Sequence, residues 1–413
     1  MQAGASAGAR PITLRTVLSL GEIAAADWDR CSQWAGPGEA DSNSQVDAAN
    51  PFISHAFLLA LEQSGSVGAR TGWTSAHLVA EDESGVIVGV APTYLKSHSQ
   101  GEYVFDHAWA DALQRAGGRY YPKLQVAAPF TPATGRRLLA APGPDALRAE
   151  RALADGVIAL RDQMNASSAH ITFQPKPEWD RMERANWLAR LDVQYHWFNR
   201  GYATYEDFLG ALASRKRKAL RRERREAPAQ GIAIERLTGN DLTEAVWDDF
   251  FAFYMDTGSR KWGRPYLARA FFSLIGQSMA DRIVLVMARR EGRYIAGAIN
   301  FLGQDALYGR HWGCKEDHPF LHFEVCYHQA IDHALSLGLA RVEAGAQGDH
   351  KIARGYEPVL TRSSHAIAHP GFRRAVADFL QHETAQIDHL LEAMRSDLPF
   401  ASRSGADPDT RSD

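Results

Sequence analysis

The sequence has little cysteine and no long apolar run. Its three cysteines are Cys31, Cys314 and Cys326, an odd and sparse set that builds no disulfide framework and is typical of a reducing compartment. No run approaches the roughly 18 apolar residues of a membrane-spanning helix. The first twenty residues also lack the apolar core of a secretory signal. We therefore predict a cytoplasmic protein without membrane insertion.

A strong charge of one sign is also absent. The net charge is −3 over 413 residues, so the overall balance does not favour nucleic acid or an anionic membrane as a partner. A hydrophobic content of 45% and a charged content of 23% are typical of soluble globular proteins. This length exceeds one ordinary core and predicts two domains.

The histidines and cysteines between His311 and His333 do not follow the spacing of a zinc site. Cys326 falls on the apolar face of a helix expected over Leu321 to Leu337, so we interpret it as a core residue and expect no metal. Cys314 would act as a nucleophile only beside a base such as His311.

Two segments of similar sequence lie about two hundred residues apart. LVAEDESGVIVGVA, Leu78 to Ala91, matches VMARREGRYIAGAI, Val286 to Ile299, and each reads as a β-hairpin. Helices and further strands follow both hairpins in the same order. We therefore predict two copies of one α/β unit, over residues 11–192 and 193–396, with a flexible N-terminus at 1–10 and a disordered tail at 397–413.

A loop rich in glycine and chargeable side chains lies between two strands expected over Val342 to Ala346 and Val359 to Ile367. Strands on both sides of such a loop are a common way for a rigid scaffold to present a site, although a solvated surface loop has the same composition. The loop contains Gly345, Gln347, Gly348, Asp349, His350, Lys351, Arg354, Gly355 and Tyr356.

A basic helix is expected from Tyr205 to about Glu226. Its cations could hold a tRNA phosphate backbone or an anionic substrate, although internal pairing with Glu223 and Glu226 would make it an ordinary solvated helix. The eight cations are Arg215, Lys216, Arg217, Lys218, Arg221, Arg222, Arg224 and Arg225.

The order of elements in each unit resembles the GNAT acyltransferase fold, and two copies in one chain resemble the Fem peptidyltransferases and their FemAB-like relatives. The resemblance is closest in PFISHAFLLALEQSGS at 51–66, in residues 101–139, and in residues 311–365. It implies an α/β protein of tandem GNAT-like units with mixed, mostly antiparallel sheets. It also implies an N-acyltransferase.

Near their C-terminus the Fem proteins carry a Phe-Lys-x-x-Phe-Gly stretch. Here the similar stretch runs from His350 to Gly355, so Lys351 and Gly355 match the family pattern, whereas His350 and Arg354 replace its two aromatic residues.

N-acyl transfer needs a deprotonated amine, an activated carbonyl and stabilisation of the developing oxyanion. We predict that Lys351 stabilises the oxyanion or binds phosphate; the alternative is an exposed lysine paired with Asp349 or Glu343. His350, His311 and Glu343 are the candidate proton acceptors, and each could instead be structural.

Substrate contacts are expected from both units. The second unit would contribute its loop, and the first unit the stretch from Tyr121 to Thr131. The predicted substrate-binding residues are Tyr121, Lys123, Phe130, Thr131, Gln347, Arg354, Gly355 and Tyr356.

The Arg/Gln-x-x-Gly-x-Gly/Ala loop of acetyl-CoA-dependent GNAT enzymes is missing. Arg136 and Arg137 could bind phosphate in the first unit, or belong to an ordinary turn. We expect no tightly bound cofactor, and either acyl-CoA or aminoacyl-tRNA as the acyl donor, which makes tRNA a candidate partner.

The predicted function is therefore transfer of an acyl or aminoacyl group onto the amine of a small molecule or peptide, such as a peptidoglycan precursor. Two alternatives remain open: an acetyl-CoA-dependent N-acetyltransferase of a small amine, and a non-catalytic module that binds RNA or a precursor.

Overall fold

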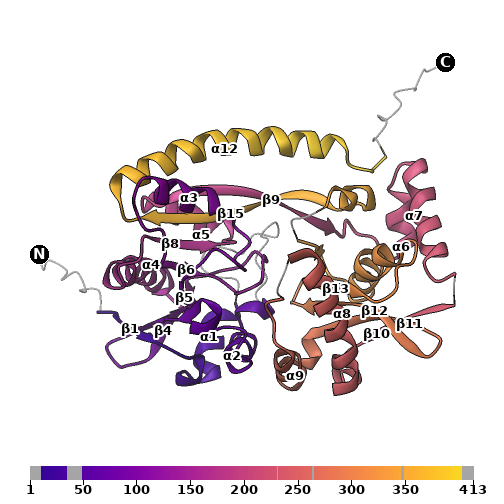
Figure 1. Ribbon diagram of the computed structural model, residues 1–413, viewed down its shortest axis with the longest axis horizontal. Coiled ribbons are helices and arrows are strands. Elements are labelled where there is room, and N and C mark those ends of the chain that lie inside the picture. The colour runs from indigo at the N-terminus through magenta and orange to yellow at the C-terminus, as the bar shows by residue number, and fades with distance from the viewer. Residues whose placement is uncertain (1–10, 35–48, 230, 263–264, 346–347, 402–413) are drawn as a thin grey trace, which may run out of the picture.

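The computed structural model describes residues 11–34, 49–229, 231–262, 265–345 and 348–401. Within these residues the strands form two sheets, one with the order β1-β3-β4-β7 and a larger one with the order β10-β11-β12-β13-β14-β9-β15-β8-β6-β5-β2. The pairs β13–β14 and β6–β8 are parallel, and the other pairs are antiparallel. Helices cover both halves (Figure 1).

The first half of the chain, at the left of Figure 1, supplies the small sheet and one end of the large sheet. Its strands are β1 (Thr13–Val17), β2 (Trp73–Ser75), β3 (His77–Glu81), β4 (Ile87–Ala91), β5 (Thr93–Lys96), β6 (Lys123–Val126), β7 (Leu139–Ala140) and β8 (Ser168–Thr172). Its helices are α1 (Ala25–Ser32), α2 (His55–Gln63), α3 (His107–Arg115), α4 (Ala146–Gln163) and α5 (Lys176–Arg184).

The second half supplies the other end of the large sheet. Its strands are β10 (Ile232–Leu237), β11 (Ile283–Arg290), β12 (Arg293–Leu302), β13 (Ala306–Cys314) and β14 (Arg341–Glu343). Its helices are α6 (Tyr205–Gly210), α7 (Ser214–Glu226), α8 (Glu244–Trp262), α9 (Arg269–Ser278), α10 (Leu321–Phe323) and α11 (Gln329–Ser336), with a π-helical turn at Glu324–His328 between the last two.

Both predicted hairpins are present, as β3–β4 and β11–β12. Each has a break in register at the same place in the repeat, after Ala80 in the first copy and after Ala288 in the second. The return strand of the first hairpin ends at Ala91, and a new strand begins after Pro92. β4 stays in the small sheet while β5 joins the large one, and proline has no N–H for a continuous ladder.

Two long strands connect the halves. β9 (Leu188–Phe198) follows β8 in sequence but lies beside β14, and β15 (Glu357–Ile367) follows β14 but lies beside β8. The two pair with each other from Glu357–His196 to His365–Leu188. The two halves thus exchange a strand. β9 pairs with a strand of the second half, and β15 pairs with a strand of the first half. The predicted boundary at 192/193 falls inside β9 and stays a prediction.

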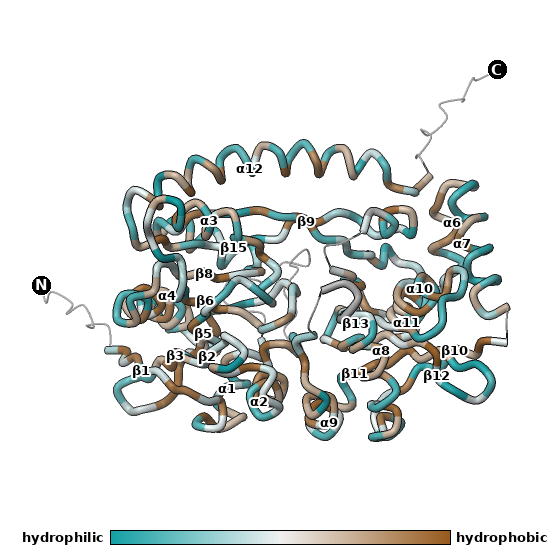
Figure 2. Tube along the Cα trace, viewed as in Figure 1, coloured by the Kyte–Doolittle hydropathy of each residue, from teal (hydrophilic) through white to brown (hydrophobic). Residues whose placement is uncertain are grey.

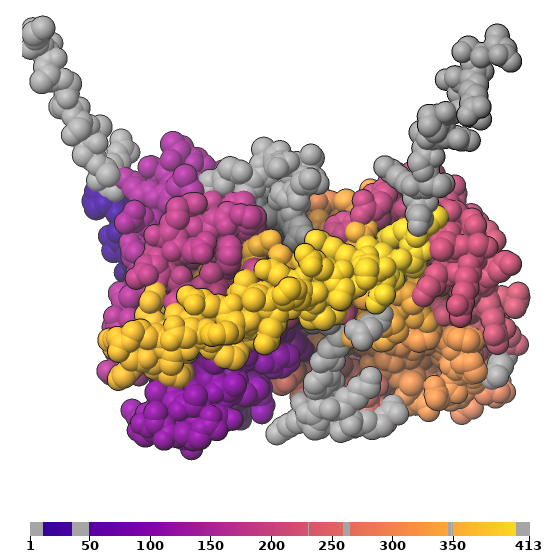
Figure 3. Space-filling view, turned by 90° about the horizontal axis from the view of Figure 1, so that it is seen from above, coloured from indigo at the N-terminus to yellow at the C-terminus, as the bar shows by residue number. Residues whose placement is uncertain are grey.

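The last helix, α12 (Pro370–Ser396), lies along β9 and β15 and crosses both halves (Figures 1 and 3). Polar and apolar residues alternate along it, as the mixed colours of Figure 2 show. Its buried residues are Val376, Leu380 and Leu391. Arg190 of β9 and Glu383 of α12 form an ion pair of 2.7 Å. The closing helix therefore fastens the strand pair that joins the units.

The largest apolar core is shared between the two halves. Phe52 beside α2 contacts Phe301 of β12 edge to face, with ring centroids 5.1 Å apart. Phe57 of α2 contacts Phe271 of α9 in the same way at 5.5 Å. Burying rings of this size contributes on the order of 2–3 kcal/mol each, so this contact strongly opposes separation of the halves.

The predicted basic helix 205–226 is two helices instead of one. The chain turns between α6 and α7, where Leu212 bridges to Phe400 and the N–H of Ala213 donates to the carbonyl of Pro399. These contacts use backbone groups that a continuous helix would need. The first residues of the predicted disordered tail, 397–401, therefore pair with the fold, whereas 402–413 and 1–10 lie outside the described residues.

Residues 101–104 form a bend in which Tyr103 has a φ of 57°. Across the described part of the chain, no helix combines the length and the apolar character that crossing a membrane requires.

Gly313 allows α8 to approach β13 closely. A Cβ at this position would lie 2.1 Å from the carbonyl oxygen of Phe253 on α8. We expect Gly313→Ala to lower the free energy of unfolding by about 1–3 kcal/mol, because the helix must move. The matched control is Gly210→Ala, whose Cβ would meet nothing within 4 Å. Thermal unfolding of both variants checks this, and equal melting temperatures would contradict it.

Candidate active site

A wedge opens between the parallel strands β13 and β14. They pair at Ala306–Arg341, Leu307–Val342 and Tyr308–Glu343, after which β13 continues to Cys314 while β14 ends. A cavity of about 400 Å³, open solvent included, lies where they separate. Its lining residues are Ala298, Asn300, Gly309, Arg310, His311, Trp312, His322, Cys326, Tyr327 and Ala344. We call it the wedge cavity.

The helical wall of the wedge cavity contains the π-helical turn at Glu324–His328. Such turns widen a helix locally and are frequent at functional sites. Here the turn carries Cys326 and Tyr327, and His322 precedes it. Cys326 packs against the core, as the sequence predicts, but it is only half-buried and also lines this cavity.

A β-bulge on β13 forms the floor. Ile299 of β12 pairs with His311, whereas Asn300 pairs with Gly309, so Arg310 is an extra residue on β13. A bulge redirects side chains locally. Arg310 and His311 accordingly line the wedge cavity and also a second cavity.

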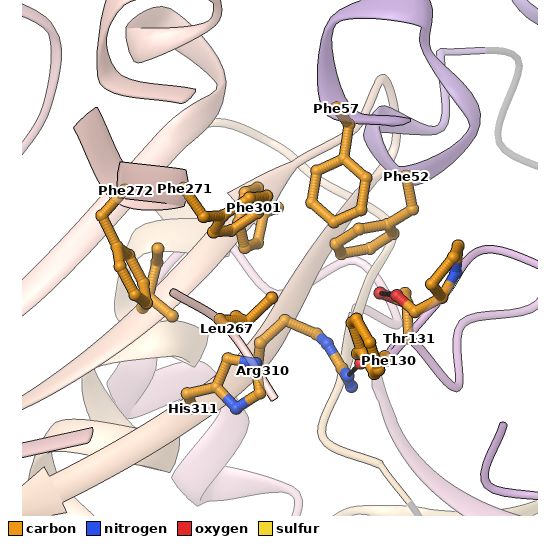
Figure 4. Close-up of a pocket in the computed structure, with 12 residues that line it drawn as sticks. Phe52, Phe57, Phe130, Thr131, Leu267, Phe271, Phe272, Phe301, Arg310 and His311 are labelled. Atoms are coloured by element: carbon orange, nitrogen blue, oxygen red, sulfur yellow. Dashed lines mark hydrogen bonds between the residues drawn. The ribbon is translucent and has the colours of Figure 1, made fainter. Parts of the chain in front are cut away.

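The second cavity lies between the two halves and is mainly aromatic (Figure 4). It measures about 280 Å³, with the solvent at its mouth included. Its lining residues are Phe52, Phe57, Pro129, Phe130, Thr131, Leu267, Phe271, Phe272, Ile299, Phe301, Arg310 and His311. We call it the aromatic cavity. It receives residues from both predicted units.

The first half holds Arg310 in place. The guanidinium donates to the carbonyl oxygen of Phe130 and bonds the hydroxyl of Tyr103. Burial lowers the pKa of Arg310, and the Tyr103 hydroxyl and the charge of Glu343 oppose that shift. The side chain stays a cation at neutral pH, because an arginine pKa lies far above that range.

His311 is a neutral imidazole at physiological pH. Burial lowers its pKa to about 3, and the nearby Arg310 charge acts in the same direction. Its ring packs edge to face on Tyr254 at 5.0 Å. A neutral imidazole accepts a hydrogen bond, but one with so low a pKa is a weak general base. Of the four predicted catalytic residues, His311 is the one that lines a cavity.

Lys351 is buried, in contrast to the exposed lysine that was the alternative expectation. Its ammonium donates to the carbonyl oxygens of Ala344 at 2.6 Å and Gly345 at 3.1 Å. Burial lowers its pKa to about 8. These two carbonyls follow the last residue of β14, so Lys351 holds the chain where β14 leaves β13. We assign it a positioning role at the wedge.

The other loop residues form a layer behind the wedge cavity. His350 is exposed, and its Nε2 lies 2.9 Å from the hydroxyl of Tyr327. Arg354 pairs with Glu223 of α7 at 2.8 Å and lies over the ring of Phe323. The ring of the fully buried Tyr356 packs on Tyr327. His350 and Tyr356 support the cavity wall through Tyr327, and Arg354 does so through Phe323. None of the three lines the cavity.

Gly355 lies in the same layer, and its backbone conformation favours glycine. Its φ is +84°, and a Cβ would lie 2.7 Å from the ring of Phe208. The match of Gly355 to the family pattern therefore reflects close packing against α6. Gln347 lies outside the described residues, as does the side chain of Asp349.

Glu343 ends β14 and is buried. Burial raises the pKa of its carboxyl group, while the ion pair with Arg341 at 3.0 Å opposes the shift. The second oxygen lies 3.6 Å from Nε2 of His196 on β9. Glu343 is thus engaged inside the sheet and does not line either cavity.

Lys123 and Tyr121 lie away from both cavities. The buried ammonium of Lys123 donates to Ser99 at 2.8 Å and to Glu102 at 2.6 Å, and it also bonds Asp106. Tyr121 donates to Ser99 at 2.8 Å. Both side chains hold in place the loop that contains Tyr103, whose hydroxyl bonds Arg310. Phe130 and Thr131, by contrast, line the aromatic cavity directly.

Arg136 and Arg137 cannot offer their charge to a phosphate in this conformation. Both are almost completely buried, and their guanidinium groups donate to backbone carbonyls, for example Arg136 to Leu138 and Arg137 to Gly135. Of the two readings of this stretch, the structure supports the turn.

Several residues that line the cavities escaped the sequence prediction. Arg310 is the main one, and the available signal was a charged residue inside an otherwise apolar strand, ALYGRHWGC. Asn300 gives a similar signal in YIAGAINFLG, and its amide donates to Val284 at 3.2 Å. The phenylalanines of the aromatic cavity give none, because they read as ordinary core. Among the described residues, no group of three His, Cys, Asp or Glu side chains could hold a metal ion.

The depressed pKa of Lys351 predicts a pH effect on stability. The folded chain binds the proton of this amine less tightly than the unfolded chain does, because the pKa falls from 10.5 to about 8. The contribution of Lys351 therefore becomes more favourable as the pH rises through about 8. We expect the melting temperature of the wild type, relative to Lys351→Met, to increase between about pH 7 and about pH 9.5. Other titrating groups largely cancel in this difference. A difference that does not change with pH would contradict the buried, positioning role.

The comparisons with known proteins agree with this architecture. The FemAB-like family, described as peptidoglycan biosynthesis/recognition, matches residues 19–402. FemX is structurally similar, with a TM-score of 0.50 and 12% identity over 86% of this chain and 98% of its own. A conserved protein of unknown function from Bacteroides thetaiotaomicron has a TM-score of 0.51 and 10% identity over 86% of this chain and all of its own. No curated protein matches the sequence.

The match to FemX confirms the predicted fold class, tandem GNAT-like units with mixed, mostly antiparallel sheets. The family match supports a transferase. Because that match spans nearly the whole length, the chain belongs to the FemAB-like family.

Proposed function

We propose that this protein transfers an acyl or aminoacyl group from an activated donor onto an amine, with the reaction at the wedge between β13 and β14. One observation carries the proposal: two parallel strands pair over three positions and then separate around a cavity. Beyond Tyr308, no described strand pairs with β13 on that side. Backbone groups on this edge are therefore available to a ligand.

The wedge supplies the elements that acyl transfer needs. Backbone N–H groups beside the bulge, together with the Arg310 cation, stabilise the oxyanion that forms when the amine attacks the carbonyl carbon. His311 accepts a hydrogen bond from the attacking amine, and the displaced proton passes on to solvent, because this imidazole is too weak a base to keep it. Lys351 fixes the far strand of the wedge through Ala344 and Gly345.

The basic helix α7 supports an aminoacyl-tRNA as donor. Its inner face holds the wall of the wedge cavity, since Glu223 pairs with Arg354 and with His328. On its outer face Arg221 and Arg222 pair with Glu206 and Glu226. Arg215, Lys216 and Lys218 form no ion pair among the described residues. Cations at the start of a helix oppose its dipole, which a bound phosphate would relieve.

The family description and the likeness to FemX favour an amine of a peptidoglycan precursor as the acceptor. The wedge itself supports acyl-CoA as the alternative donor, because parallel strands that separate can hold an extended ligand by backbone contacts.

Blocking the wedge tests its role and identifies the donor. Ala344 is half-buried and lines the cavity, so we expect Ala344→Phe to abolish the thermal stabilisation given by the true donor. The ligands are acetyl-CoA, charged tRNA and uncharged tRNA. The control is Ala393→Phe on the exposed face of α12, which should behave as the wild type.

Stabilisation by charged tRNA alone supports aminoacyl transfer, and stabilisation by acetyl-CoA supports the acetyltransferase. Salt-sensitive RNA binding without turnover of any amine would favour a binding module. A donor that stabilises Ala344→Phe as well as the wild type would remove the wedge as the donor site.

The role of α7 has a separate test in the salt dependence of tRNA binding. Arg215 and Lys218 are exposed and unpaired within the described chain, so we expect the double variant Arg215→Gln, Lys218→Gln to bind tRNA more weakly. The slope of log affinity against log salt should fall by about 2. Arg222→Gln is the control, because its charge is already paired with Glu226 at 2.8 Å. If all three proteins give one slope, α7 does not contact the RNA.

A further inference from the structure

The side chain of Asn300 on β12 presents an unused acceptor to the wedge cavity. The residue is 1% exposed, and its Nδ2 donates to the carbonyl oxygen of Val284 at 3.2 Å. Because that partner can only accept, the bond fixes which end of the amide carries the oxygen. The other end, Oδ1, accepts no hydrogen bond from the part of the chain that the structure describes. A buried amide oxygen in this state is suited to an N–H group of a ligand.

Gly309 keeps this oxygen uncovered. It lies opposite Asn300 on β13, and both residues line the wedge cavity. A Cβ added at Gly309 would lie 3.3 Å from Oδ1, so the oxygen stands on the face of the sheet that the cavity occupies. A larger residue at this position would cover it. The space beside the oxygen admits several water molecules, which is enough for a small amine.

The charges close to the wedge cavity are positive. Among the described residues no Asp or Glu lines it, whereas Arg310 does. The ammonium of Lys351 lies behind Ala344, whose carbonyl oxygen it bonds at 2.6 Å. Two cations with no carboxylate in the wall disfavour a third cation, because like charges repel in a partly desolvated site. An ammonium ion is therefore a poor ligand for this cavity, although a neutral N–H group is a good one.

The helical wall of the cavity does not change this balance. It adds three titratable side chains, His322, Cys326 and Tyr327, and none of them is a carboxylate. Burial raises the pKa of Tyr327, so its hydroxyl stays protonated, and it bonds His350 at 2.9 Å. An ammonium ion that entered would find no carboxylate partner on this side.

The strands do not supply a proton acceptor either. Glu343 at the end of β14 is buried and paired with Arg341 at 3.0 Å, and it does not line the cavity. Burial lowers the pKa of His311 to about 3, and the Arg310 charge acts in the same direction. Such a weak base does not take the proton of an ammonium ion. Neither residue can therefore deprotonate an amine that arrives charged.

Lys351 shows what this region does to an amine. Burial lowers its pKa from 10.5 to about 8, the charge of Arg310 acts in the same direction, and Cys326 opposes the shift. Arg310 on β13 thus acts across the wedge on a nitrogen held beside the other strand. The amine of a ligand between these two residues experiences the same cations.

We propose that the wedge cavity takes its acceptor as a neutral amine, with one N–H on Oδ1 of Asn300. It thereby selects weakly basic amines, such as the α-amino group of an amino acid or peptide, over strongly basic ε-amines. This rests on the proposed function, because it names the acceptor of that transfer. The amine leaves its ammonium proton in solvent before it binds. Its lone pair then attacks the carbonyl carbon, the bond from that carbon to the leaving group of the donor breaks, and the proton released from the new amide nitrogen goes to solvent.

The basicity of the amine sets the size of this selection. An α-amino group has an ordinary pKa of about 7.7–8.0, and the ε-amine of lysine one of about 10.4. At pH 7 the neutral fraction is therefore on the order of 300 times larger for the α-amine.

Two amines of similar shape separate neutral from charged binding without a donor. Trifluoroethylamine is mainly neutral at pH 7 because its fluorines withdraw electrons, whereas ethylamine is an ammonium ion there. We expect the wild type to bind trifluoroethylamine at pH 7 and to bind ethylamine at least about a hundredfold more weakly, with dissociation constants from ligand-observed NMR. The ratio should fall about tenfold for each pH unit between about pH 7 and about pH 9, as neutral ethylamine becomes more abundant. Titration of Lys351 acts on both amines and cancels in the ratio.

Three variants locate the binding. Asn300→Asp places a carboxylate beside Gly309, so we expect it to bind ethylamine at pH 7 at least as tightly as trifluoroethylamine. Asn240→Asp adds the same charge at an exposed position and should match the wild type. Ala344→Phe fills the cavity and should abolish the binding of both amines. Circular dichroism confirms that each variant is folded, and the pH series on the wild type does not depend on any of them.

The proposal is overturned if ethylamine binds the wild type at pH 7 as tightly as trifluoroethylamine, if neither amine binds, or if binding survives Ala344→Phe. The transfer reaction and the selection of its acceptor fail separately. Alanyl-lysine carries both kinds of amine, so a transfer assay with the donor identified by thermal stabilisation shows which one reacts. Reaction at the ε-amine as fast as at the α-amine would end the proposed selection and leave the proposed function. Neutral-amine binding with this pattern, but no transfer from any donor, would do the reverse.

Discussion

The structure depends on the pairing of two long strands that each cross into the opposite half. β9 leaves the first half to lie beside β14, and β15 leaves the second half to lie beside β8, while the two remain paired along nearly their full length. Sliding one half against the other would break this ladder and the register on either side. Because each strand has two alternating faces, a shift by one residue would also exchange its buried and exposed side chains. The halves are therefore fixed relative to each other, with α12 fastened across the join.

This fixed relation allows one half to complete the site of the other. The bulge on β13 belongs to the second half, but Arg310 takes its hydrogen bonds from Phe130 and Tyr103 of the first half. Tyr103 is held in turn by a buried network around Lys123, in which Glu102 and Asp106 balance the ammonium. The charges of that network balance one another. Removing one of them would leave another ion buried and unpaired, which would destabilise the fold. Residues that resemble substrate contacts in the sequence therefore act as the support of Arg310.

The sequence predicts the local elements well and the site only in part. The matching hairpins are visible because a strand alternates with a period of two and a glycine turn is distinctive, so the repeat, the order of elements and the loop after β14 can be recognised. The strand exchange cannot be recognised, because a β-strand carries no mark of the partner it will choose. The aromatic cavity cannot be recognised from the sequence for the same reason. Phe52 and Phe301 are 249 positions apart by number and read as core until the halves are brought together.

The loop at 345–356 illustrates why chargeable residues alone are a weak sign of a catalytic site. Its lysine and arginine are buried, and each is matched to a fixed acceptor: Lys351 to the carbonyls beyond β14, and Arg354 to Glu223 of α7. Such pairs hold the end of one strand and the wall of one helix at set positions, which are the two sides of the wedge. Arg310 differs because its acceptors are neutral oxygens and its surroundings are aromatic, so its charge is still available to a ligand. A half-buried cation whose hydrogen bonds go to neutral oxygens is the stronger indicator of where chemistry occurs.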